Sequence, residues 1–145
     1  MIPDYIDQPL VFIDLETTGA NFARDRVLEI GCVEVDRDGV REWSSLVNPA
    51  VGVTPFITQL TGIDDAMVRG APTFPEIAPS ILAWLQGVVV VAHHAPFEDA
   101  FLSAEYSRAG WSLPPLPAID TLPIAQACVP TPDHKLMTVC DWAGI

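Results

Sequence analysis

The stretch from Leu10 to Gly19 reads LVFIDLETTG, an apolar run of strand length that ends in two acids one residue apart. Strand side chains alternate between the two faces of a sheet, so Asp14 and Glu16 point to the same side. Two carboxylates in one partly desolvated place repel each other, and the pKa of at least one rises unless a cation lies between them. The hard cations Mg²⁺ and Mn²⁺ suit such oxygen ligands. A strand whose end simply reaches solvent explains the same spacing equally well.

Three strands are expected in the first third of the chain. The almost continuous apolar run Leu10–Leu15 predicts a central strand covered on both faces. The β-branched segment Val27–Val35 predicts a second strand, and the turn residues 37–39 predict a hairpin into Val40–Val47. Residues 1–9, which contain two prolines, predict an irregular start.

Helix signals separate the remaining segments. Thr54 before Pro55 suits a helix N-terminus, and Thr73 with Glu76 has the spacing of a capping box. The expected elements are helices over 55–60, 63–68, from 74 up to Gly87, from Pro96 up to Gly110, 122–128 and 135–143, and strands over 88–92 and 118–120.

The helix that begins at Pro96 follows a buried strand directly. Phe97, Ala100, Phe101 and Ala104 recur at helical intervals, so we expect them to face the core. Strands first, then alternating helix and strand, predict an α/β fold with a mixed central sheet flanked by helices, in one domain over residues 1–145. In such sheets, acids at the carboxyl ends of central strands usually mark the site.

The charge of the chain restricts its partners. The formal net charge is −12, with seven Lys and Arg residues, which argues against a protein that grips duplex DNA through its phosphates. A nucleic-acid partner would therefore be held through metal ions, backbone amides and local contacts. The longest clean apolar run, Val88–Ala92, is far too short to span a bilayer. We expect a cytoplasmic protein with no membrane contact.

Four motifs in order resemble the DnaQ-like 3′–5′ exonucleases, the proofreading branch of the DEDD nucleases. They are Phe12–Gly19, Arg26–Gly31, Leu60–Ile63 and Val91–Glu98, and together they cover much of the chain. Residues 41–49 are also similar to the exonuclease domain of polymerase III epsilon-subunit proteins.

The resemblance implies a ribonuclease-H-like fold and a hydrolase that acts on the 3′ end of single-stranded nucleic acid in DNA replication or repair. It implies two divalent cations, Mg²⁺ or Mn²⁺. The metal-binding and catalytic residues would be Asp14, Glu16 and Glu98. The residues that contact the terminal nucleotide, through hydroxyl groups, backbone amides or pocket walls, would be Thr17, Thr18, Leu60, Thr61, Gly62 and His94.

The second motif departs from the family pattern, which reads His-Asn-x-x-Phe-Asp. This chain has His94 at the Asn position and Glu98 at the Asp position. Glu98 keeps a carboxylate on a longer side chain and is expected to take the family role. Asp99 is a weaker substitute, because one residue turns a helix by about 100°. His93 is expected to be a hydrogen-bonded structural residue.

The third motif of the family, a His five positions before an Asp in a final helix, is not found. His134 and Asp141 are seven positions apart. We therefore interpret His134 as a solvent-facing or cap residue and Asp141 as a helix-surface acid. The resemblance gives Asp120 a structural role near the last strand. The chain is therefore expected to stop before the final helix that completes the family's active site, either as a fragment of a longer protein or as a product that lacks this helix.

Two other functions agree with the same residues. The fold can serve as a degenerate, non-catalytic module that binds a polymerase or another partner, which the unusual Glu98 and the incomplete third motif favour. It can also belong to an exonuclease that trims RNA. Expected partners are a single-stranded 3′ end, with DNA favoured, and a DNA polymerase or a fused nuclease module.

Overall fold

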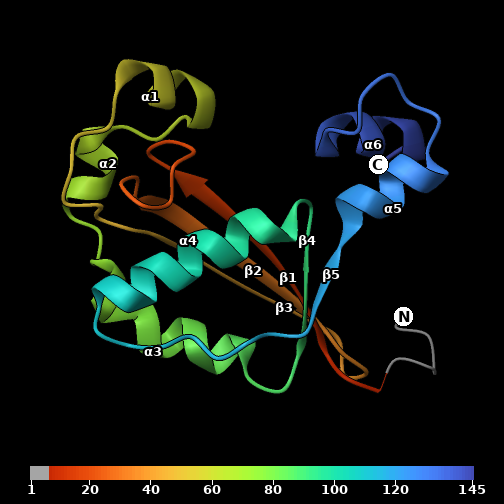
Figure 1. Cartoon of the computed structure of the whole chain (residues 1–145), viewed down its shortest axis with the longest axis horizontal. Helices are drawn as coiled ribbons and strands as arrows, with labels where there is room; N and C mark the ends of the chain where they lie inside the picture. The colour runs from red at the N-terminus through yellow and green to blue at the C-terminus, as the bar shows by residue number, and fades with distance from the viewer. Residues whose placement is uncertain (1–6) are drawn as a thin grey trace.

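The computed structural model describes residues 7–145 and contains a five-stranded mixed sheet (Figure 1). Strands β1 (Leu10–Thr17), β2 (Val27–Val35) and β3 (Val40–Leu46) pair antiparallel, and β4 (Val89–Ala92) and β5 (Ala118–Asp120) continue the sheet in parallel with β1. The strand order is β3-β2-β1-β4-β5. The hairpin and the mixed sheet expected from the sequence are confirmed.

The helices begin and end where local signals predicted. Thr54 caps the first helix by accepting from the amide of Ile57, and Gly62, with a φ of 78°, ends it. Thr73 and Glu76 form the expected capping box. The helices are α1 (Pro55–Thr61), α2 (Asp65–Arg69), α3 (Phe74–Leu85), α4 (Ala95–Arg108), α5 (Thr121–Cys128) and α6 (Leu136–Ala143).

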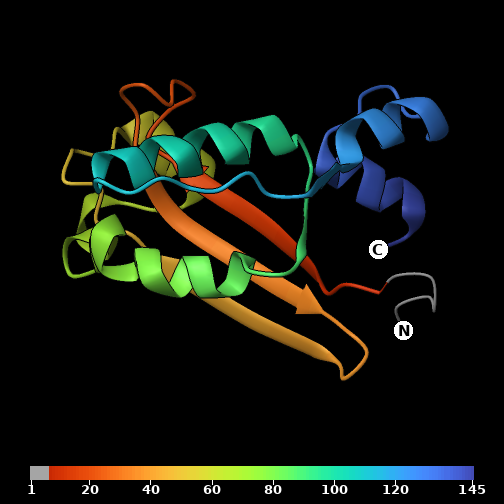
Figure 2. The ribbon, with the colours of Figure 1, turned by 60° about the horizontal axis from the view of Figure 1, so that its bottom comes forward.

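Helices α3 and α4 lie on one face of the sheet (Figures 1 and 2). The main core lies between them and the sheet, where Phe74 of α3 meets Tyr106 of α4 edge to face with ring centroids 5.2 Å apart. Helices α5 and α6, which we call the arm, follow β5 and lie apart from α3 and α4. No residue of α6 is buried.

One expectation about buried faces is wrong, and a second is confirmed only in part. Strand β1 is covered on one face only, because Val11, Ile13 and Leu15 are buried while Phe12 is 43% exposed. On α4, Phe101 is buried and Phe97 packs against the core as predicted, whereas Ala100 and Ala104 are half-buried. The buried face consists of Glu98, Phe101, Leu102, Glu105 and Tyr106. An apolar pattern missed this face because two of its five residues are acids.

Residues 1–6 of the expected single domain lie outside the described residues. Of the irregular start predicted for residues 1–9, only 7–9 are described, and they belong to no helix or strand. Among the helices of residues 7–145, none has the length and apolar character needed to cross a membrane.

Candidate active site

The carboxyl ends of three parallel strands meet at one edge of the sheet, between α1 and the arm (Figure 1). Phe12 of β1 pairs with Val91 of β4, and Ala92 pairs with Asp120 of β5. Asp14 therefore lies just beyond the part of β1 that pairs with β4, on the edge where α4 begins. This is the part of a parallel sheet where sites are usually built.

Asp14 and Glu16 lie on the same face of β1, as predicted, on the side opposite the core. Asp14 lines a groove of about 630 Å³ between the sheet and the arm. Its partner across the strands is Gly31, which leaves the space beside the carboxylate open. Although Asp14 is accessible, the surrounding protein partly removes its carboxylate from water and raises its pKa.

Glu16 faces a second acid that the sequence did not reveal. Glu29 of β2 pairs directly with Glu16, and the register shifts at the next residue, Thr17. Burial raises the pKa of Glu16, and the charges of Asp14 and Glu29 raise it further. Like charges opposite each other destabilise a sheet, so a cation beside them would relieve this strain.

Glu98 extends from the first turn of α4 and is only 6% exposed. Its Oε2 atom is buried and has no hydrogen-bond partner among the described residues. Burial raises the pKa of Glu98 to about 7, and the negative charges of Asp14 and Asp120 add to the rise. Buried polar atoms are almost always paired, so this oxygen calls for a missing ligand or cation.

The predicted metal ligands are close enough to affect one another but do not form a finished site. Asp14 influences the pKa of both Glu16 and Glu98. Glu98 and Asp120 line a second hollow of about 510 Å³, which shares Ile13 and Ala92 with the groove of Asp14. Within residues 7–145, no three Asp, Glu, His or Cys side chains are arranged to hold one metal ion. The unpaired Oε2 of Glu98 and the raised pKa values still fit a divalent cation at this edge.

Thr17 and Thr18, predicted to contact the nucleotide, have hydroxyl groups that bind within the protein. The Thr17 hydroxyl donates to the carbonyl of Gly19 at 2.7 Å, and the Thr18 hydroxyl accepts from the amide of Arg26 at 2.9 Å. Contacts from this segment to a ligand would therefore come from the backbone.

Of the predicted pocket residues at the end of α1, one also uses its hydroxyl within the protein and another is exposed. The Thr61 hydroxyl donates to the carbonyl of Ile57 and accepts from the amide of Ile63. Gly62 ends the helix in the left-handed conformation. Leu60 is 70% exposed and is free to contact a ligand. In both ribbon views α1 lies beside the loop that joins β1 to β2, at the same end of the sheet (Figures 1 and 2).

The two adjacent histidines differ in role. His93 is structural, as expected, because its ring binds the Thr121 hydroxyl at 2.9 Å and the carbonyl of His134 at 2.6 Å. His94 caps α4 with a φ of 90°, a conformation that costs energy in a residue with a side chain. Its amide donates to Asp120 at 2.9 Å, so Asp120 joins the start of α4 to the end of β5.

Asp99, Asp141 and His134 lie outside the candidate site. Asp99 and Asp141 are exposed, the latter as predicted. His134 is neither solvent-facing nor a cap. It is half-buried, its ring binds the carbonyl of Val129, and Lys135 is the residue that precedes α6 as its N-cap.

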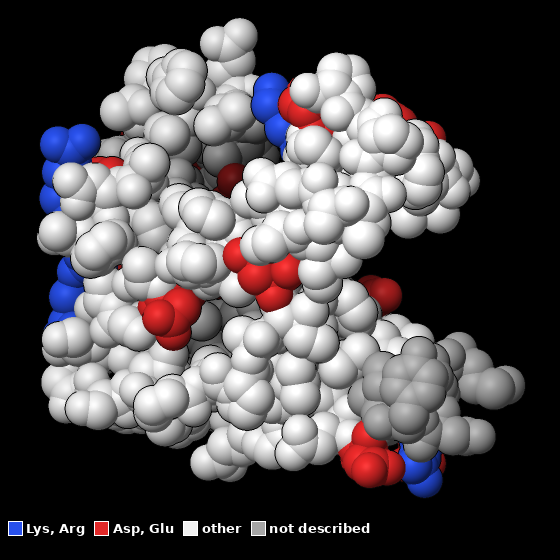
Figure 3. Space-filling view, turned by 45° about the vertical axis from the view of Figure 1, so that its right-hand side comes forward, with Lys and Arg blue, Asp and Glu red and all other residues white. Residues whose placement is uncertain are grey.

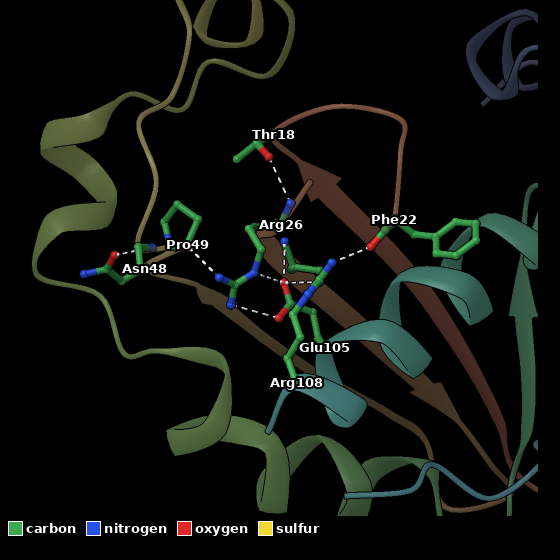
Figure 4. A network of polar contacts seen from close by, with 9 residues as sticks. Thr18, Phe22, Arg26, Asn48, Pro49, Glu105 and Arg108 are labelled. Atoms are coloured by element: carbon green, nitrogen blue, oxygen red, sulfur yellow. Dashed lines mark hydrogen bonds and ion pairs between the residues drawn. The ribbon is translucent and has the colours of Figure 1, made fainter. Parts of the chain in front are cut away.

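A buried ion pair beside the site was missed from the sequence. The Arg26 guanidinium donates to both carboxylate oxygens of Glu105, at 2.8 and 3.0 Å, and to the carbonyl of Pro49 at 3.0 Å (Figure 4). Glu105 also accepts from the amide of Val27 at 3.1 Å. The two residues are 79 positions apart. The sequence signal that could have indicated the pair was the acid Glu105 at a position of α4 that faces the core.

The raised pKa of Glu98 makes the stability of the metal-free protein depend on pH. The unfolded chain releases this proton near 4.5, whereas the folded protein keeps it to about 7. The contribution of Glu98 to stability is therefore complete below pH 4.5, falls as the pH rises to 7 and is then lost; it corresponds to about 3 kcal/mol. We expect a Glu98→Gln variant to lose this dependence in urea unfolding between pH 5 and 8 with EDTA.

The exposed neighbour on the same helix turn is the control for this measurement. An Asp99→Asn variant is expected to keep the pH dependence of the unsubstituted protein. A Glu98→Gln variant that loses as much stability between pH 5 and 7 as the unsubstituted protein would show that the dependence comes from other groups, such as Asp14 and Glu16, whose pKa values are also raised.

The sequence is similar to those of known exonucleases and DNA polymerases. The exonuclease family model RNase_T matches residues 11–141. The chain is 34% identical over 122 residues to a DNA polymerase III of the PolC type from Caldanaerobacter subterraneus subsp. tengcongensis, covering 83% of this chain and 9% of that protein. It is 33% identical over 125 residues to the 3′–5′ exonuclease DinG from Bacillus subtilis, covering 85% of this chain and 13% of that protein. The chain thus spans about a tenth of the length of these relatives.

A solved structure has the same architecture. Exonuclease I from E. coli, in complex with a 5cy-dA13 oligonucleotide, matches with a TM-score of 0.83 over 96% of this chain and 36% of its own length. The sequence identity is 17%, so this likeness shows the fold. It confirms the expected ribonuclease-H-like architecture.

Proposed function

This chain belongs to the exonuclease family whose model matches residues 11–141, and on that premise we propose that it removes nucleotides from the 3′ end of single-stranded DNA with the help of divalent cations. We propose that it does so as a single exonuclease domain.

The unpaired, buried Oε2 of Glu98 beside Asp14 carries the proposal. A folded protein gains little from a carboxylate oxygen that is buried without a donor and close to two other acids. Such a group is retained where a cation can neutralise it. The acids belong to different elements, β1 and α4, so a bound cation would hold these elements together.

We propose that Asp14, Glu16 and Glu98 hold Mg²⁺ or Mn²⁺ and that two ions occupy the complete site. When bound, these cations stabilise the negative charge on the phosphate and on the departing 3′ oxygen. The protein binds and orients the terminal nucleotide. Backbone amides near Thr18 and the exposed Leu60 would contact it from one side, and His94 at the start of α4 would contact it from the other.

The acidic surface supports this kind of partner over duplex DNA. Figure 3 shows basic side chains as isolated spots on the face drawn, with no continuous basic patch. A single strand held by its end needs fewer phosphate contacts than a duplex. The names of the relatives further support association with a DNA polymerase, either in a longer chain or as a separate subunit.

A single-stranded oligonucleotide labelled at its 5′ end tests the proposal. With Mn²⁺ or Mg²⁺ we expect labelled products that shorten stepwise from the 3′ end, and no products with EDTA. Early release of the labelled nucleotide would show the opposite polarity and contradict the proposal.

Two further results separate the other functions. An RNA strand of the same sequence that is degraded faster than DNA would show an RNA-trimming enzyme, because the 2′-hydroxyl is what distinguishes the two. A DNA strand that binds but stays intact with either cation would show a non-catalytic binding module.

A further inference from the structure

The loop of residues 18–26, between β1 and β2, is held in one shape by its own hydrogen bonds. The amide of Asn21 donates to the Asp25 carboxylate at 2.8 Å, and the amides of Arg24 and Asp25 donate to the carbonyl of Asn21 at 3.0 and 2.7 Å. Asp25 packs so closely on Gly19 that a Cβ there would lie 2.4 Å from its Oδ2. The loop therefore has little freedom to rearrange.

The loop is also fixed to the body of the protein at both its base and its tip. At the base, the amide of Thr18 donates to the carbonyl of Arg26 at 2.8 Å, and Arg26 binds Glu105. Near the tip, Arg108 of α4 donates to the carbonyl of Phe22 (Figure 4). Two arginines thus hold the loop against α4.

This rigid loop exposes an aromatic ring. Phe22 is 50% exposed, and Figure 4 shows its ring directed away from the Arg26–Glu105 pair. Half of the ring stays in water, and the hydrogen bonds of the loop already fix its shape, so burial of the ring is not what orders this segment. Because the loop is ordered, the exposure is a fixed feature of the surface.

The Phe22 ring and the Arg24 guanidinium belong to the segment that directly follows the proposed site residues Thr17 and Thr18. Phe22 is four residues from Thr18, so their Cα atoms are at most about 14 Å apart. Stacked bases follow one another at ~3.4 Å, which places the ring within reach of the first four or so nucleotides. Arg24 of the same loop has a side chain that is 77% exposed, and within residues 7–145 its one ion pair is a 3.5 Å contact to Asp25.

We propose that the loop of residues 18–26 is a second contact site for the single strand, in which Phe22 stacks on a base near the 3′ end and Arg24 pairs with a phosphate. An exposed ring beside an exposed guanidinium is the combination that binds single strands without regard to sequence. This inference rests on the proposed function, because it requires a single strand at the neighbouring acids.

Equilibrium binding of a fluorescent 12-nucleotide single strand tests the ring. The fluorescence anisotropy is measured with Ca²⁺, and the strand is checked on a gel to be intact afterwards. We expect Phe22→Ala to raise the Kd by about 5- to 100-fold, Phe22→Leu to behave like Phe22→Ala, and Phe22→Trp to bind like the unsubstituted protein. Trp142→Ala is the matched control, since Trp142 of α6 is also a half-exposed aromatic, at 56%.

Strands with one abasic nucleotide show whether the contact is stacking. At the second, third or fourth position from the 3′ end, one abasic site is expected to weaken binding of the unsubstituted protein and to leave the Kd of Phe22→Ala unchanged. For Arg24→Gln we expect the slope of log Kd against log salt to fall by about 0.7, the value of one phosphate contact in single strands.

Three results would overturn the loop proposal. The first is a Phe22→Ala variant that binds the strand as tightly as the unsubstituted protein, and the second is a Phe22→Leu variant that does so. The third is a Kd of Phe22→Ala that stays higher than that of the unsubstituted protein by the same factor on every strand with an abasic site. Thermal unfolding of each variant shows that it is folded. If Asp14→Asn stops 3′-end degradation while Phe22→Ala leaves binding intact, the loop proposal fails and the proposed function stands. If the unsubstituted protein binds no single strand, both fail.

Discussion

An Asp14→Asn variant is expected to lose at least about 100-fold in Mn²⁺ affinity and in the rate of 3′-end degradation. Loss of a residue that only supports a metal ligand costs about 10- to 100-fold, and loss of a ligand itself should cost at least the upper value. Asp14 is the acid whose charge reaches both Glu16 and Glu98. It lies in the open groove, with only Gly31 opposite it. Without the Asp14 charge, no proposed ligand lies close to both Glu16 and Glu98, so these two acids would not bind the same cation.

Calorimetric titration with Mn²⁺ and the rate on a 5′-labelled strand measure the two losses separately. The two adjacent acids of α4 give a matched pair. Glu98→Gln is expected to lose metal affinity as Asp14→Asn does, whereas Asp99→Asn, which changes an exposed side chain, is expected to keep it. An Asp14→Asn variant with unchanged Mn²⁺ affinity would contradict the assignment, and loss in Asp99→Asn alone would move the ligand from Glu98 to Asp99.

Element boundaries were predictable because the signals that set them are local. The caps at Thr54 and Asp64, the capping box at Thr73 and the left-handed turn at Gly62 are each formed by residues within a few positions. The same holds for the shared side of Asp14 and Glu16, which follows from the period of a strand. These features do not depend on what packs against them.

Burial could not be predicted in the same way, because it depends on neighbours that are distant in the sequence. The apolar run of β1 indicated cover on both faces, yet the side of Phe12 faces the groove beside the arm. On α4, Glu98 and Glu105 occupy buried positions that an apolar pattern leaves out. Glu105 is stable there because of Arg26, whereas the Oε2 atom of Glu98 has no hydrogen-bond partner among the described residues.

The residues of the candidate site stay a prediction, and the structure adds neighbours to them that the sequence did not indicate. The sequence placed Asp14, Glu16 and Glu98 in one site, and the structure shows that Asp14 affects the pKa of the other two. It also adds Glu29, opposite Glu16, and Asp120, which binds the amide of His94. The proposal that the three acids share a cation still requires them to move closer together when it binds.

Replacing Arg26 by methionine is expected to lower the free energy of unfolding by about 3–5 kcal/mol, the cost of leaving one partner of a buried ion pair uncompensated. Glu105 is 1% exposed and receives two hydrogen bonds from Arg26, and the 3.5 Å contact to Arg108 replaces them poorly. For a domain of this size the loss corresponds to a fall in Tm of roughly 10–15 °C. Thermal unfolding and urea titration measure it.

An exposed pair and a double variant show whether burial is the cause. Arg37→Met removes a pair with Asp7 at 3.4 Å in which both side chains are exposed, and it is expected to change the Tm little. Combining Arg26→Met with Glu105→Leu removes both charges, and we expect it to recover part of the loss, because no isolated carboxylate stays buried. Recovery is incomplete because the amide of Val27, which donates to Glu105, loses its acceptor. A double variant less stable than Arg26→Met would show that Glu105 stabilises the fold through Val27 and Arg108 more than through Arg26.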